Sequence, residues 1–103
     1  MAKKKAPTKA EKLHMAAVAE LGCIVCLNLG FGGTPAEIHH VRYLAGAGQK
    51  ASHFETIGLC RTHHLHHGYG VSFHDGKVEW ERNYGTEEML LNQTRKLLGI
   101  DHD

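Results

Sequence analysis

Four side chains of the types that bind structural zinc occur in two pairs with equal spacing. Two residues separate Cys23 from Cys26, and two residues separate Cys60 from His63. A spacer of this length lets both side chains of a pair turn toward one ion, and three thiolates with one imidazole suit a tetrahedral site. The alternative is that the cysteines are buried as small apolar residues. Because the spacing occurs twice, we expect a structural Zn²⁺ held by Cys23, Cys26, Cys60 and His63.

A second group of histidines has the chemistry needed to hydrolyse a phosphodiester. His39 and His40 are adjacent, and His64 follows in a later segment. Hydrolysis requires an activated water and relief of the charge that builds on the phosphate, and an imidazole base with a metal ion supplies both. The alternative is a histidine-rich patch without a catalytic role.

The composition favours metal binding over disulfide formation. The chain of 103 residues contains ten histidines and only three cysteines, which cannot all pair with one another. The histidines are dispersed through the middle of the chain, which disfavours a purification tag. This length fits one small domain, near the lower limit at which a hydrophobic core is stable by itself. A bound metal ion that stabilises the fold is therefore expected.

Charge is distributed unevenly along the chain although the net charge is only +1. Residues 1–7 are predicted to form a disordered basic arm, whose Lys3, Lys4 and Lys5 would contact DNA phosphates. The alternative is a tail that only aids solubility. No apolar run approaches the roughly 20 residues of a bilayer span, and no signal peptide is apparent, so we expect a cytoplasmic monomer without a membrane partner.

The elements that must position these residues can be predicted from local patterns. Thr8 and Glu11 have the spacing of a capping box, which predicts a helix from Thr8 through Leu21 that ends at Gly22. Its apolar residues at intervals of four predict a buried stripe. The stripe consists of Leu13, Ala17 and Leu21.

The middle of the chain has the pattern of a hairpin followed by a helix. Residues 37–43 and 56–59 are predicted strands, joined by a glycine-containing loop over 45–52. Residues 60–67 are a predicted short helix that stops at Gly68. Neighbouring residues of a strand point to opposite faces, so the first strand must end or bend at His39 and His40 for both to serve one site.

Two helices are predicted in the remainder. Asp75 is the expected cap of a helix that carries Trp80 and Tyr84 as core residues. Thr86 is the expected cap of a last helix through Leu98. Its predicted apolar face consists of Leu90, Leu91, Thr94, Leu97 and Leu98. Together these elements indicate an α+β fold in which residues 8–103 form one domain.

From about Cys23 to Leu98 the sequence resembles the HNH endonucleases, which have a ββα-metal (His-Me finger) core. Within them it is most similar to phage-borne recombination enhancement nucleases that depend on RecA. The resemblance rests on Cys-x-x-Cys, Ile38-His39-His40, residues 48–52, residues 56–64 with Cys-x-x-His-His, and Tyr84-Gly85-Thr86. It implies that His40 is the general base, and that His39 and His64 bind a catalytic Mg²⁺ or other divalent ion. DNA and a RecA filament are the partners it implies.

The sequence departs from the family pattern at the central asparagine, which orients the base. Nothing in residues 53–56 corresponds to it, so His53 or Glu55 must take that role. The third ligand of the catalytic metal is also open between His67 and His74, and we favour His74. Phosphate contacts are expected from basic residues that flank the site, namely Arg42, Lys50 and Arg61.

We therefore expect a metal-dependent DNA endonuclease that acts in phage or prophage recombination. The alternative is a zinc-stabilised DNA-binding or adaptor module without cleavage activity. A structural zinc alone would leave four histidines unexplained, which favours the enzyme. They are His39, His40, His64 and His74. A histidine-rich metal buffer or sensor is disfavoured because the ligands alternate with a hairpin pattern.

Overall fold

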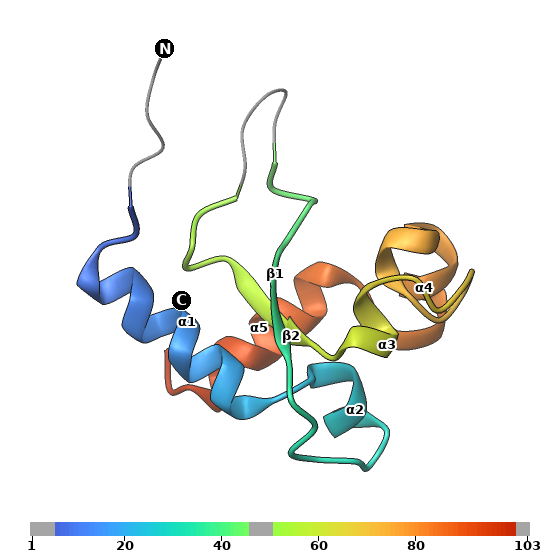
Figure 1. Cartoon of the computed structure of the whole chain (residues 1–103), viewed down its shortest axis with the longest axis horizontal. Helices are drawn as coiled ribbons and strands as arrows, with labels where there is room; N and C mark the ends of the chain where they lie inside the picture. Colours follow the sequence, from blue (N-terminus) through green and yellow to red (C-terminus); the bar gives the residue numbers. More distant parts are fainter. Residues whose placement is uncertain (1–5, 46–50, 101–103) are drawn as a thin grey trace.

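The computed structural model describes residues 6–45 and 51–100, and within them the fold is α+β, as predicted. Lys3, Lys4, Lys5 and Lys50 lie outside the described residues, so their proposed DNA contacts remain predictions. The elements in chain order are α1 (Lys9–Leu21), α2 (Ile24–Asn28), β1 (Glu37–His40), β2 (Thr56–Leu59), α3 (Arg61–His64), the 3₁₀ turn η1 (Phe73–Asp75), α4 (Lys77–Tyr84) and α5 (Glu87–Leu97). The hairpin lies at the centre of Figure 1, with α1 on one side and α3 and α4 on the other.

Helix α1 begins at the predicted capping box. The Thr8 hydroxyl accepts a hydrogen bond from the Glu11 amide at 3.1 Å, and the Glu11 carboxylate accepts one from the Thr8 amide at 2.7 Å. The predicted buried stripe is wrong, because Leu13 is 63% exposed and Val18 is the buried residue of this helix. The helix packs against both strands of the hairpin, and its buried Val18 lies one position beyond the predicted Ala17.

The predicted hairpin is confirmed as an antiparallel pair in which Glu37 lies opposite Leu59 and His40 lies opposite Thr56. All four residues of β2 are buried. The first strand is shorter than the predicted 37–43. The Val41 amide still donates to the Glu55 carbonyl, but the amides of Arg42 and Tyr43 donate to the side chain of Glu87, so the pairing goes no further.

The helices around the hairpin depart from prediction at their ends. Asp75 is not the cap of α4: it lies in η1, and its carboxylate accepts a hydrogen bond from the Gly68 amide at 3.2 Å. The predicted helix over 60–67 is reduced to Arg61–His64 because Leu65 is extended. The cap of α5 is confirmed, since the Thr86 hydroxyl accepts from the Met89 amide. Helix α2 was not predicted, because its five residues are too few to show periodicity.

The core lies between the hairpin and the helices. Trp80, Ile57, Leu59 and Leu91 are completely buried in it. On the last helix the predicted apolar face is confirmed at Leu90, Leu91 and Thr94, whereas Leu97 is half exposed at the end of the helix. None of the helices in the described part of the chain has both the length and the apolar character needed to cross a bilayer.

Candidate functional site

The structure brings the first predicted ligand set together at the junction of α2 and α3. The sulfur and ring nitrogen atoms of Cys23, Cys26, Cys60 and His63 all lie within 4.8 Å of one another, and all four residues are buried. The Cys26 and Cys60 sulfurs are 3.7 Å apart, and the Cys26 sulfur is 3.5 Å from His63 Nδ1. Two sulfurs that each lie about 2.3 Å from a tetrahedral ion are separated by about 3.8 Å. The cluster therefore has the dimensions of a zinc site.

Burial shifts the pKa values of two members of this cluster in opposite directions. It raises the pKa of the Cys23 thiol to about 12, more than hydrogen bonds from the Cys60 and Cys26 amides lower it. Burial lowers the pKa of His63, which favours the neutral imidazole that a metal requires. The Cys23 sulfur accepts from the Cys26 amide, and Trp80 Nε1 donates to the His63 carbonyl at 3.0 Å. These bonds tie the cluster to α2 and α4.

The second cluster joins three histidines from three elements. His39 comes from β1, His64 from α3 and His74 from η1, and their nearest ring nitrogens all lie within 4.8 Å of one another. His39 Nδ1 is 3.3 Å from His64 Nε2. His67, the other predicted candidate for the third ligand, lies apart from the cluster, and its Nδ1 donates to the Leu65 carbonyl at 2.9 Å. The geometry therefore favours His74 as the third member.

His39 and His64, the two less exposed histidines of this cluster, each have a carboxylate behind them. Glu87 Oε2 lies 2.7 Å from His39 Nε2, and Glu37 Oε1 lies 2.9 Å from His64 Nδ1. An ionised carboxylate can only accept, so both of these ring nitrogens carry the proton when the rings are neutral. The lone pairs of His39 Nδ1 and His64 Nε2 then face each other across 3.3 Å. Two nitrogens bound to one tetrahedral ion are about 3.4 Å apart, so a cation fits between them.

The pKa values of the cluster favour neutral imidazoles. Burial lowers the pKa of His39 more than the hydrogen bond to Glu87 raises it. Burial likewise lowers the pKa of His74, and the neighbouring His39 and His64 lower it further. Since a metal binds the unprotonated nitrogen, these shifts favour metal binding at neutral pH.

Glu87, like Glu37 and Lys77, is a residue of this site that sequence reasoning missed. It is completely buried at the first position of α5, 48 residues from His39 along the chain. In the sequence it is one of two acidic residues in the first turn of a helix, a pattern that commonly reflects only the helix dipole. The signal that could have singled it out is its place directly after Tyr84-Gly85-Thr86, a segment already noted for its resemblance to a nuclease family.

His40 has a different partner from His39 because neighbouring strand residues point to opposite faces. Its Nε2 lies 2.8 Å from Nδ1 of His53. Glu55, the other candidate for the orienting role, accepts from the Ser52 amide at 2.8 Å and thereby closes the turn before β2. Of the two candidates, His53 is thus the one that contacts the imidazole of His40.

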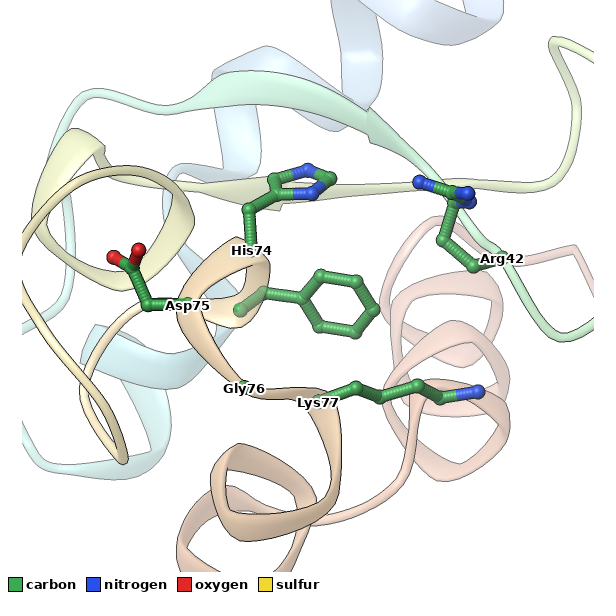
Figure 2. A pocket seen from close by; sticks show the side chains of 6 residues that line it. Arg42, His74, Asp75, Gly76 and Lys77 are labelled. Atoms are coloured by element: carbon green, nitrogen blue, oxygen red, sulfur yellow. The ribbon is translucent and has the colours of Figure 1, made fainter.

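A pocket of about 490 Å³ adjoins the three-histidine cluster. Arg42 and Lys77 line it together with His74 and Asp75, and Figure 2 shows their two cationic side chains on the same side. The Asp75 carboxylate lies on the far side of His74 from Arg42 in that view, where it accepts from Gly68. Lys77 was not predicted as a site residue. The predicted Arg61 is exposed and lies 3.7 Å from the Glu37 carboxylate.

Fold and site together define a small α+β protein with two side-chain clusters able to hold metal ions. The family model described as recombination enhancement, RecA-dependent nuclease matches residues 7–99. The chain therefore belongs to this family, and the resemblance found in the sequence is confirmed at that level. A search of curated proteins found no match. The family description makes the protein a nuclease associated with recombination.

Proposed function

We propose that the protein is a metal-dependent DNA endonuclease of the HNH type, with a ββα-metal core formed by β1, β2 and α3. The observation that carries this proposal is the cluster of His39, His64 and His74 next to a pocket with two cationic side chains. A zinc-stabilised binding module would have no need of this second cluster. Membership of a nuclease family supports the same conclusion.

Two metal ions belong to the proposal. Zn²⁺ at the Cys23 cluster would hold α2 to α3 and contribute to folding. At the histidine cluster a divalent ion would offset the charge that develops on the phosphate during cleavage. Imidazole ligands suit Zn²⁺, Ni²⁺ and related ions, whereas Mg²⁺ prefers oxygen ligands, so we expect a transition metal there rather than Mg²⁺.

His40 is the proposed general base. When its Nε2–H donates to His53 Nδ1, the lone pair that can take a proton from water is on His40 Nδ1. His53 would then hold the ring of His40 in one tautomer and orientation. This is the role that the central asparagine has in the related nucleases, and we assign it to His53 rather than Glu55 because of the 2.8 Å contact.

Arg42 and Lys77 are proposed to hold backbone phosphates of the DNA at the pocket that they line. A RecA filament is proposed as the partner on the strength of the family description alone. Lys3, Lys4, Lys5, Lys50 and Arg61 remain proposed phosphate contacts.

The proposal is tested by cleavage of plasmid and single-stranded oligonucleotide with a panel of divalent ions, with and without a RecA filament. Cleavage should depend on the added ion. His39→Ala and His64→Ala should need a higher metal concentration, whereas added metal should not restore His40→Ala. If no combination of metal, strand form and filament gives cleavage by the parent protein, the nuclease proposal fails. The protein would then be interpreted as a DNA-binding module.

A further inference from the structure

Glu87 has more hydrogen bonds than its position in a helix requires. Besides His39 Nε2 at 2.7 Å, its carboxylate accepts from the amides of Arg42 and Tyr43 at 2.8 to 3.0 Å. Lys77 Nζ lies 3.9 Å away. The side chain is completely buried, so a negative charge there is tolerable only with such partners.

The direction of the His39–Glu87 hydrogen bond follows from these contacts. Both oxygens of Glu87 accept from backbone amides, Oε1 from Arg42 and Tyr43 and Oε2 from Arg42, as a carboxylate does. Glu87 therefore accepts from His39 and does not donate to it.

We infer that Glu87 is a positioning residue, which holds His39 in the tautomer with its proton on Nε2 and so presents the Nδ1 lone pair to the metal. This inference rests on the proposed function and deepens it. A carboxylate behind a metal-binding histidine fixes the ring orientation and makes the ligand more basic. Glu87 also fixes the backbone of Arg42, so one buried carboxylate places both a metal ligand and a residue of the phosphate pocket.

Glu37 offers an internal comparison, because it stands behind His64 as Glu87 stands behind His39. Its side chain is 41% exposed and also faces Arg61, so water can replace it as the acceptor for His64. Water has no access to the buried His39–Glu87 pair, since the two side chains are 2% and 0% exposed. The fully buried carboxylate should therefore matter more than the exposed one.

The test uses Glu87→Gln, which preserves the shape of the side chain but lets its amide nitrogen donate to His39 Nε2. The proton of His39 would then move to Nδ1, the nitrogen that should bind the metal. Nuclear magnetic resonance of ring nitrogens, before any divalent ion is added, should show the Nε2–H tautomer of His39 in the parent and its loss in the variant. Isothermal titration with Ni²⁺, on protein that retains its zinc, should show affinity weakened by about 10- to 100-fold.

Glu37→Gln should weaken Ni²⁺ binding less than Glu87→Gln does, and Glu88→Gln, at the exposed neighbouring position, should leave it unchanged. Retention of one zinc and of the parental circular dichroism spectrum would show that the variants are folded. Parental Ni²⁺ affinity in Glu87→Gln, or the Nδ1–H tautomer of His39 in the parent, would overturn the inference. If the parent binds no Ni²⁺, the proposed metal centre fails, while the tautomer of His39 still decides whether Glu87 orients it.

Discussion

The imidazoles of His40 and His53 lie edge to face, with their centroids 5.0 Å apart and Nε2 of His40 2.8 Å from Nδ1 of His53. Since one nitrogen of such a pair must donate and the other accept, each ring restricts the tautomer of the other. The pair brings together the end of β1 and the loop before β2, two segments that a sequence-based argument links only through the hairpin.

Substitutions at this pair should separate the base from the residue that orients it. His40→Ala should lower the rate of DNA cleavage by about 10² to 10⁴, the usual contribution of a positioned general base. His53→Ala should lower it less, and His53→Asn should retain more activity than His53→Ala because an amide can still hold His40. Single-turnover cleavage rates measure these effects. Equal rates for His40→Ala and the parent would remove His40 from the mechanism.

Zinc content is the second prediction. The purified protein should retain about one zinc per chain, because structural sites of this kind bind with apparent free energies of about 10 to 16 kcal/mol. Cys26→Ser should lose the metal and unfold or aggregate, as followed by metal analysis and circular dichroism. A Cys26→Ser protein as stable as the parent would show that the cluster is only a set of buried thiols.

Lys77 should contact DNA through charge alone. Lys77→Gln should weaken DNA binding and reduce the slope of log affinity against log salt by about 0.9 on duplex DNA, since one phosphate contact is lost. The matched control is Arg82→Gln at the other end of α4, where the exposed guanidinium pairs with Glu79 and does not line the pocket. Equal slopes for the two variants would argue against a phosphate in the pocket.

Stability should fall in mild acid partly through His14. Burial, and then the charge of Arg95, lowers the pKa of His14 below its ordinary value of 6.5, and its Nε2 is buried without a hydrogen-bond partner among the described residues. The unfolded chain therefore binds this proton more readily. The stability due to neutral His14 is fully present above pH 6.5 and is lost as the pH falls through the lowered folded-state pKa.

His14→Leu should accordingly reduce the drop in melting temperature between pH 7 and pH 5, whereas His67→Gln, at an exposed position, should not. Thermal melts of the three proteins across this range provide the measurement. A parent and a His14→Leu variant with parallel profiles would show that His14 is protonated as easily in the folded state as in the unfolded one.

The amino-acid sequence was sufficient to predict features that depend on residues close together in the chain. The capping box of Thr8 and Glu11, the cap at Thr86 and the strand over 56–59 each rest on a few adjacent residues, and the structure confirms them. The two chelating pairs at Cys23 and Cys60 were also visible, because the spacing within each pair is local. Patterns failed where an element was short, as with α2, or where a whole helix face had to be chosen, as with Leu13 on α1.

The tertiary structure alone decided which distant side chains meet. Glu87 is a common first-turn glutamate in sequence, and only the packing of α5 against β2 brings it to His39. The same holds for Lys77, which lines one pocket with Arg42, for the contact of His40 with His53, and for the grouping of His74 with His39 and His64. These contacts join residues from separate elements, and a contact of this kind depends on how the elements pack. Local sequence therefore singled out the residues of the two clusters, while packing determined how they are paired and brought Glu87 and Lys77 to the site.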